Sequence, residues 1–385
     1  MKITRRKWLR QAAGTATAAG VASLLRADER FASDHRDNPE KNTAGAGSLK
    51  AHAAARGLLT GAAVNTHLLH SDVIYRQVLA EQSNILVGEN CMKFGPTHPK
   101  PDTYFFNDAD GLVSFADTTG MKVRGHNFVW HEALPEWFAG TVTSQNAKKI
   151  LVDHIMTVGG RYKGKIHSWD VVNEAIWIPD GRPEGLRSSS PWFQMLGPDY
   201  LDLAYRTAHE ADPDALLTYN DYGIENDSAD EGKKRAAVLA LLKRMKAAGT
   251  PIHALGVQSH LSAASTSGYA NGTRELLDGA RALGLQVFIT ELDVKDDGLD
   301  SDDPAARDQE VAGVYGDFAS RMLEGKDVKA VLTWGVSDAH SWLNGPKWRV
   351  KHPEREQRPL PFDTHYMPKP AFFALRDSFD KAKRR

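Results

Sequence analysis

The sequence has one cysteine, Cys91, so no disulfide can form within the chain. Net charge is also nearly absent: 48 basic residues almost balance 49 acidic ones. The chain therefore has no net positive charge that would attract nucleic acid, and we expect no nucleic-acid partner. The Ala/Gly-rich run from Gln11 to Leu25 is too short and too weakly apolar to span a bilayer. Because no cysteine for acylation lies near it, we expect no membrane anchor.

The amino terminus carries a pattern typical of protein export. Arg5 and Arg6 precede the run from Gln11 to Leu25, as in a bacterial twin-arginine signal. We assign residues 1–27 to such a signal, and expect a periplasmic or secreted protein. The alternative is a basic amphipathic helix of the folded domain. Residues 28–55 are interpreted as a polar linker or disordered segment.

From Arg56 to Arg385 the sequence alternates short apolar strands with helical segments. The expected strands are Leu58–Val64, Ile85–Glu89, Lys122–Trp130, Lys165–Ala175, Leu216–Asp221, Ala254–His260, Leu285–Asp293 and Lys329–Asp338. The expected helices span residues 71–83, 107–119, 145–159, 198–211, 230–248, 273–283, 307–323 and 371–381. Eight strand–helix units predict an α/β protein with one domain, a (β/α)8 TIM barrel at 56–385.

Two of the predicted strands end in a glutamate. The strand Lys165–Ala175 brings Glu174 to its end, and the strand Leu285–Asp293 brings Glu291. Both are apolar along their length, as strands buried on both faces are. A glutamate in either place could instead cap a helix or pair with a surface lysine. Because ligands bind at the carboxyl ends of barrel strands, we expect a carboxylate pair facing one cavity.

The other strand ends carry polar and aromatic side chains as well. They are Glu89 at the end of strand two with Asn90 and Lys93 just after it, His126 and Trp130 in strand three, Asn173 in strand four, Tyr222 after strand five, Gln258 and His260 in strand six, Asp293 in strand seven, and Trp334 and Trp342 in and beyond strand eight. Each fragment alone is a weak signal. Together they place carboxylates, amides, imidazoles and indoles at one rim, where a barrel enzyme has its catalytic groups.

These blocks resemble the endo-β-1,4-xylanases of glycoside hydrolase family 10 from about Leu58 to Leu375. The matching segments, in the family's order, are Glu89–Lys93, Arg124–His131, Trp169–Ala175, Gln258–Leu261, Thr290–Asp293, Trp334–Asp338, Arg358–Asp363 and Lys369–Ala371. The resemblance implies a monomeric enzyme without cofactor or metal that acts on xylan.

The resemblance also implies a role for each site residue. Glu174 would be the acid/base and Glu291 the nucleophile of a retaining double displacement. His260 and Asp293 would form a relay that keeps Glu291 ionised, and Asn173 would bind the sugar 2-hydroxyl. The glycone subsites would be lined by Glu89, Asn90, Lys93, His126, Trp130 and Gln258. Trp334 and Trp342 would form a floor and lid at the cleavage point, with Tyr222 toward the leaving group.

Several of these residues have a structural alternative. Asp293 could cap the loop after its strand, and His126 could be a core histidine. Lys93 could be solvated, and Trp342 could pack within its loop. Asp170 lies inside its strand and is interpreted as an anchor for an arginine or a backbone group.

Some positions depart from the family's pattern, among them Glu132 where the family usually has serine. Phe94 stands where the family usually has tryptophan, and Ala133 where it usually has glutamine after His131. Leu343 stands where many members have arginine. We expect the changes at Phe94 and Ala133 to weaken the grip on long, undecorated xylan.

Other classes of protein fit the sequence less well. A metal-dependent barrel hydrolase needs paired histidines on strand one, where His67 lies well past the strand's end. A non-catalytic sugar-binding barrel would lack one of the two glutamates. A β-1,4-glucanase or an exo-acting enzyme on the same machinery stays open, because pocket volume separates these substrates.

Overall fold

The structure is a computed structural model that describes residues 42–385. The predicted export signal and residues 28–41 of the predicted linker lie outside the described residues. Residues 42–48, which belong to a first unit ending at Ser48, include the 3₁₀ turn η2 (Gly45–Gly47). Leu49–Arg385 forms a second, compact unit. Within the described part of the chain, no helix is both long and apolar enough to cross a membrane.

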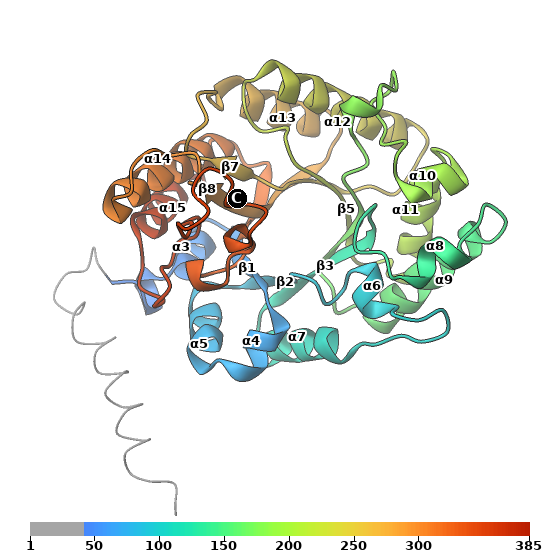
Figure 1. Ribbon diagram of the computed structural model, residues 1–385, viewed down its shortest axis with the longest axis horizontal. Helices are drawn as coiled ribbons and strands as arrows, with labels where there is room; N and C mark the ends of the chain where they lie inside the picture. Colours follow the sequence, from blue (N-terminus) through green and yellow to red (C-terminus); the bar gives the residue numbers. More distant parts are fainter. Residues whose placement is uncertain (1–41) are drawn as a thin grey trace, which may run out of the picture. The chain divides into compact units, whose positions relative to one another are not determined.

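Eight parallel strands of this unit close into a barrel (Figure 1). They are β1 (Leu59–Val64), β2 (Ile85–Gly88), β3 (Lys122–Val129), β4 (Ser168–Asn173), β5 (Leu216–Asp221), β6 (Ala254–Val257), β8 (Gln286–Lys295) and β9 (Val328–Thr333). The ring closes because β1 pairs with β9 as well as β2, and β6 pairs with β8. The predicted (β/α)8 barrel is confirmed.

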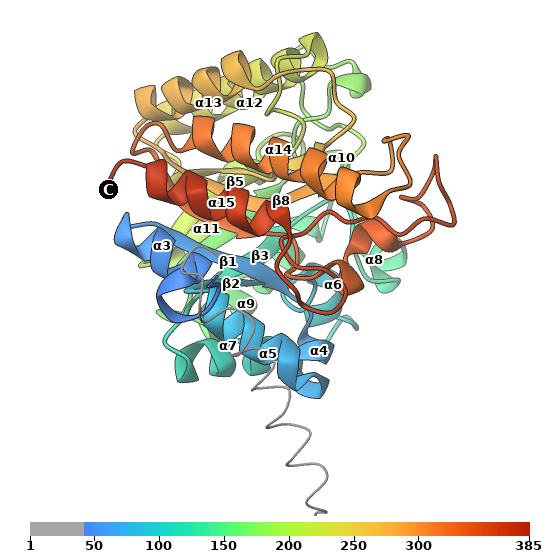
Figure 2. The same ribbon diagram turned by 90° about the vertical axis from the view of Figure 1, so that its left-hand side faces the viewer.

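Helices form the layer outside the strands (Figures 1 and 2). The longer ones are α5 (Val73–Gln82), α7 (Asn107–Thr118), α9 (Ala147–Arg161), α11 (Tyr200–Ala211), α12 (Ala229–Ala247), α13 (Ala270–Ala282), α14 (Pro304–Met322) and α15 (Pro370–Lys381). The shorter ones are α3 (Leu49–Ala55), α4 (Thr66–Ser71), α6 (Phe94–Thr97), α8 (Trp137–Thr141), α10 (Pro191–Leu196) and the 3₁₀ turns η3 (Ile178–Asp180), η4 (Asp338–His340) and η5 (Trp342–Asn344).

Helix α3 lies within the segment predicted to be a linker. Its residues Leu49 and Ala53 are buried, and the backbone N–H of Leu49 donates to the side-chain oxygen of Gln82 at 2.9 Å. The folded unit therefore begins at Leu49 rather than at residue 56. Seven residues, mostly alanine, are too few to show a helical period in sequence.

Several predicted elements have other bounds than expected, and for three of them the backbone shows the cause. The helix predicted at 71–83 is divided by Asp72, whose carboxylate caps α5 by accepting from the N–H of Tyr75 at 3.0 Å. The sixth strand stops at Val257, because Ser259 has a left-handed φ of 66°; β7 (His260–Ser262) then pairs with the end of β8. The eighth strand ends at Thr333, before Gly335 with a φ of 109°.

The barrel interior is a packed core. It contains Ala63, Ile85, Val87, Ala254, Phe288, Ala330, Leu332 and Trp334. Small alanines face the large ring of Phe288, so the interior is filled. Trp334 connects the barrel interior with the rim, because it belongs to this core and also lines a cleft above it.

Candidate active site

The two glutamates predicted from the sequence stand on one rim of the barrel, at the end of β4 and within β8, with β5 and β6 between these strands. Glu174 directly follows β4 and has a left-handed φ of 58°. Its N–H donates to the carbonyl oxygen of Asn220 at 2.9 Å, and its own carbonyl accepts from Nε of Arg187 at 2.9 Å. Glu291 lies within β8, and its N–H donates to the carbonyl of Gln258 at 2.9 Å. Hydrogen bonds on both sides thus fix the backbone of Glu174 in a sparsely populated conformation.

A chain of three side-chain amides connects the two carboxylates. Nδ2 of Asn220 donates to Oε1 of Glu291 at 2.7 Å and to Oδ1 of Asn173 at 2.9 Å. Nε2 of Gln258 donates to the same Asn173 oxygen and to Oε1 of Glu174, both at 3.1 Å. Nδ2 of Asn173 also donates to Oε1 of Glu174, at 3.0 Å. The predicted pair therefore shares one hydrogen-bonded network.

His260 connects Glu291 with Asp293. Its Nε2 lies 3.2 Å from Oε2 of Glu291, and its Nδ1 lies 2.9 Å from Oδ1 of Asp293. Nε1 of Trp342 donates to the other Asp293 oxygen at 2.7 Å. Asp293 is thus bound on both oxygens by side chains, rather than acting as a loop cap.

The two glutamates have opposite pKa shifts. Burial alone would raise the pKa of the Glu291 carboxyl, but the hydrogen bond from His260, the charges of His126 and His260, and the Asn220 amide lower it to about 2. Burial also raises the pKa of Glu174, and there the negative charge of Asp221 raises it further against the hydrogen bonds that lower it. The surroundings thus favour the ionised form of Glu291 and the protonated form of Glu174.

His260 is held in its charged form between two carboxylates. Burial would lower the pKa of its imidazole, but the charge of Asp293 and the hydrogen bonds to Asp293 and Glu291 raise it well above the ordinary value. A protonated ring can donate from both nitrogens at once, as this geometry requires.

Asp170 anchors the third-strand side of the site. Its carboxylate is fully buried, pairs with the guanidinium of Arg124, and lies 2.9 Å from Nδ1 of His126. The predicted arginine anchor is therefore confirmed. The same contact orients the His126 ring, whose edge meets Trp334 with centroids 5.2 Å apart.

A cleft of about 420 Å³ opens above these residues. Its lining includes the four predicted catalytic residues and Lys93, His126, Trp130, Asn173, Tyr222, Gln258, Trp334 and Trp342. Within residues 42–385, no group of three or more His, Cys, Asp or Glu side chains is placed to hold a metal ion.

Lys93 reaches into this cleft over two indoles. Its ammonium lies 5.0 Å from the ring centroid of Trp130 and 5.8 Å from that of Trp334. Glu89 and Asn90 are not among the lining residues; Asn90 accepts a hydrogen bond from Lys93 at 3.0 Å. The structure therefore places Asn90 as a support for Lys93, which is buried rather than solvated.

Tyr222 also lines the cleft, beside a buried ion pair. The ammonium of Lys234 lies 3.6 Å from its ring centroid and 2.7 Å from Oδ1 of Asp221. This cation–π contact fixes the ring against the end of β5.

Phe94 does not lie in the cleft. It is 2% exposed, and its ring stacks on His154 with centroids 3.9 Å apart. Ala133 does not line the cleft either; its carbonyl oxygen accepts from the N–H of Gly95 at 2.8 Å. The expectation that an indole is missing from the glycone side at Phe94 is therefore wrong.

The lining also contains residues that were not predicted from the sequence. They are Glu132, Leu261, Lys295, Leu343, Lys347 and Trp348. Asn220, which bridges Glu291 and Asn173, was missed as well. Asn220 lies one residue before the end of β5, so the strand-end rule that selected Tyr222 could have selected it too. Lys347 and Trp348 follow η5 in a segment without strand or helix, where no pattern marks them.

Comparisons with known proteins agree on one family. Residues 48–378 match the model described as glycosyl hydrolase family 10. The chain is 34% identical over 339 residues to endo-1,4-beta-xylanase B of Paenibacillus barcinonensis, covering 83% of this chain and 95% of that protein. It is 37% identical over 313 residues to a beta-1,4-xylanase of Dictyoglomus thermophilum, covering 78% and 83%. It is also 33% identical over 331 residues to exoglucanase XynX of Acetivibrio thermocellus, covering 82% of this chain and 28% of that protein.

Solved structures agree as well. Native xylanase 10B of Thermotoga maritima superposes with a TM-score of 0.77 at 35% identity, covering 87% of this chain and 98% of that one. Xylanase 10B of Thermotoga petrophila, solved in complex with xylobiose, gives a TM-score of 0.77 at 34% identity, covering 87% and 97%.

Proposed function

This chain belongs to glycosyl hydrolase family 10, and from that membership we propose that it is an endo-β-1,4-xylanase that cleaves internal bonds of xylan with retention. The observation that carries the proposal is the pairing of a carboxyl of raised pKa, Glu174, with one of lowered pKa, Glu291, in one cleft. Retaining glycosidases need such a pair, one group to give a proton and one to attack.

In the first step, Oε2 or Oε1 of Glu291 attacks the anomeric carbon, and the bond to the leaving sugar breaks. Glu174 gives its proton to the departing oxygen, so the leaving sugar departs as a neutral alcohol. A covalent glycosyl ester on Glu291 remains. In the second step, Glu174 takes a proton from water, and the resulting hydroxide displaces Glu291 from the anomeric carbon. Two inversions give net retention.

The neighbouring side chains suit these steps. His260 and Asn220 donate to Glu291 and keep it an anion aimed at the sugar. The amides of Asn173 and Gln258 can bind sugar hydroxyls beside the reacting carbon, where a contact to the 2-hydroxyl strengthens in the transition state. Trp334 at the base of the cleft offers an apolar surface for a sugar ring.

The proposal of xylan as the substrate comes from the relatives named as xylanases and from the xylobiose bound by the Thermotoga petrophila enzyme. A second candidate, a β-1,4-glucanase or an exo-acting enzyme, is kept because one relative is named an exoglucanase. Initial rates on xylan, on linear xylo-oligosaccharides and on carboxymethylcellulose separate the two. A higher kcat/KM on carboxymethylcellulose, or release of single terminal sugars alone, would overturn the endo-xylanase proposal.

Retention has its own test. Proton NMR of the first products should show the β-anomer before mutarotation. An α-anomer as first product would mean a single displacement and would remove the nucleophile role of Glu291.

We also propose that residues 1–27 direct twin-arginine export to the periplasm or beyond, and that the enzyme acts as a monomer.

A further inference from the structure

The segment after β9 builds one wall of the cleft from two tryptophans. Trp342 and Trp348 both line the cleft, and their ring centroids lie 4.3 Å apart with the planes at 73°. Nε1 of Trp342 donates to Asp293, which in turn holds His260. Trp342 is therefore the member tied to the catalytic groups, and Trp348 continues the aromatic wall beyond it.

Trp348 is half-buried and keeps part of its surface free toward the cleft. The ammonium of Lys347 lies 4.7 Å from its ring centroid. Its backbone N–H donates to the carbonyl of Gly345 at 3.0 Å. A fixed indole with a neighbouring hydrogen-bond donor is the combination that a sugar ring needs, one apolar face and polar hydroxyls around the edge.

Gln357 acts as a clamp, because its side chain donates hydrogen bonds to both ends of the segment 343–348 that carries Trp348. It is 1% exposed, and its Nε2 donates to the carbonyls of both Leu343 at 2.7 Å and Trp348 at 3.1 Å. One amide nitrogen thus uses its two N–H groups to join the two ends of the segment. The backbone N–H of Gln357 also donates to Oδ1 of Asn344 at 2.7 Å.

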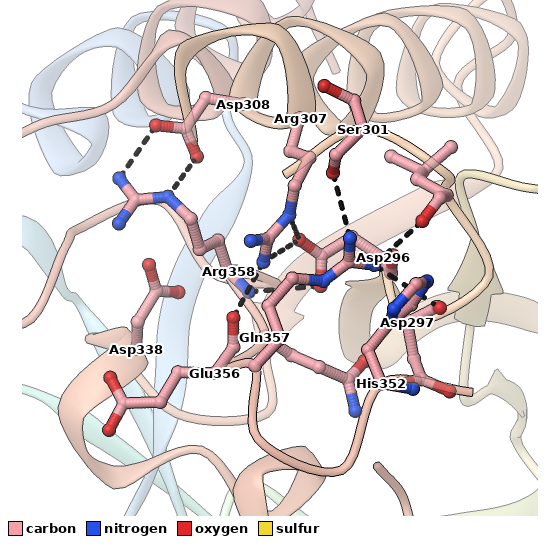
Figure 3. Close-up of polar contacts among 12 residues, drawn as sticks. Asp296, Asp297, Ser301, Arg307, Asp308, Asp338, His352, Glu356, Gln357 and Arg358 are labelled. Atoms are coloured by element: carbon pink, nitrogen blue, oxygen red, sulfur yellow. Dashed lines mark hydrogen bonds and ion pairs between the residues drawn. The ribbon is translucent and has the colours of Figure 1, made fainter. Parts of the chain in front are cut away.

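The clamp is itself anchored to the barrel (Figure 3). The carboxylate of Asp297, just past β8, accepts from the backbone N–H groups of residues 350, 351 and 352 at 3.1, 2.8 and 3.2 Å. Arg307 of α14 pairs with the buried Asp296 and donates to the carbonyl of Glu356 at 2.6 Å. Charged groups of α14 and of the residues just past β8 therefore hold both sides of a segment that has little regular structure of its own.

We propose that Trp348 contacts a sugar of the bound chain outside the two that flank the cleaved bond, and that Gln357 is the positioning residue that holds Trp348 there. The inference rests on the proposed xylanase function. Hydrogen bonds already hold this segment in place without substrate, so binding loses little conformational entropy there. The free energy of stacking on Trp348 therefore contributes to substrate affinity almost in full.

Substrate length tests the contact. Trp348→Ala should raise KM about tenfold on xylohexaose, the effect of about 1.4 kcal/mol of lost stacking, and leave kcat/KM on xylotriose within about twofold. The matched control is Phe105→Ala, which removes an aromatic ring that is 46% exposed and outside the cleft; it should behave as wild type. An unchanged KM on xylohexaose, or an equal loss on every length, would overturn the role of Trp348.

A second variant tests the clamp through pH. Gln357→Glu keeps the shape of the side chain but, when ionised, has no donor for the carbonyls of Leu343 and Trp348. Burial raises the pKa of such a carboxyl, so protonation and one O–H donor return within a workable pH range. The KM for xylohexaose relative to wild type should therefore be raised at pH 7 and recover toward pH 5, while xylotriose is little affected. A KM defect of equal size on xylotriose and xylohexaose, or a lower melting temperature with normal KM, would show that Gln357 only stabilises the fold.

The proposed function and the role of Trp348 fail on different results. If the wild type does not cleave xylo-oligosaccharides, the proposed function falls. If the wild type does cleave them and Trp348→Ala has the same kinetics as wild type on substrates of every length, the proposed function is kept and the role of Trp348 is refuted.

Discussion

Replacing His260 with alanine should move the acidic limb of the pH–activity profile upward. In the wild type, Glu291 has a pKa of about 2, and His260 supplies the first of the contacts that lower it. Glu291 must be ionised to attack. Activity that depends on the ionised carboxylate is therefore full well above that pKa and is lost as the pH falls through it. Removing the donor favours the protonated carboxyl.

The size of the shift follows from the contacts. A hydrogen bond to a charged group is worth about 1.5–3 kcal/mol, and one pKa unit is about 1.36 kcal/mol. Loss of the His260 contact at 3.2 Å should therefore raise the pKa by about one to two units. The positive charge of His260 is lost too, while Glu291 stays 5% exposed and keeps the burial that raises its pKa. The acidic midpoint should thus move from about 2 to roughly 4 or above.

The assay is kcat/KM against pH on an aryl β-xylobioside whose leaving group needs no proton, so that Glu174 does not limit the first step. Circular dichroism at each pH separates unfolding from titration. Asp293→Asn is an intermediate control, because His260 stays and only its anionic partner is lost. The acidic midpoint of this variant should lie between those of the wild type and His260→Ala. An acidic limb that stays in place while activity falls equally at every pH would refute the reasoning.

Three further outcomes are expected. Glu174→Ala should be nearly inactive on xylan but active on activated aryl glycosides, and azide should rescue it to a β-glycosyl azide; rescue of Glu291→Ala to a β-glycosyl azide instead would mean that the two roles are exchanged. Phe94→Trp should lower the free energy of unfolding by about 1–3 kcal/mol, because it overpacks a buried ring, and leave KM on linear xylo-oligosaccharides unchanged; a lower KM would restore the view that Phe94 belongs to a subsite. Replacing both Arg5 and Arg6 with lysine should trap the protein in the cytoplasm in a fractionation assay; unchanged export would remove the twin-arginine proposal.

The barrel and the two glutamates could be predicted because their signals are local. A strand buried on both faces reads as an unbroken apolar run, and the residue that ends it is visible in the sequence. Glu174 and Glu291 both follow such runs, and the structure brings them into one network. The anchoring role of Asp170 could be predicted for the same reason, since a carboxylate inside a buried strand needs a partner.

The predictions from the sequence are wrong or incomplete where a residue's place depends on the direction of its side chain or on contacts between distant parts of the chain. Phe94 comes one residue after Lys93, which enters the cleft, but its own ring turns outward to pack on His154. The sequence does not show which way a side chain points once its strand has ended. Trp348 has no element around it, and it reaches the cleft only because Gln357 and Asp297 fold its segment back onto the barrel.

The different states of the two glutamates depend on the charge of the groups around them. Glu174 receives two hydrogen bonds on Oε1, both from neutral amides, so neither of these donors brings a positive charge against the burial that raises its pKa. Its Oε2 lies 4.0 Å from Nδ1 of His131, and burial together with the charges of Arg187 and Lys234 lowers the pKa of that imidazole to about 4. His131 is therefore neutral at neutral pH and offers no charge to stabilise an anion on Glu174. Glu291 faces a histidine whose pKa is raised by Asp293. The site thus separates acid from nucleophile with two histidines, one kept neutral and one kept charged.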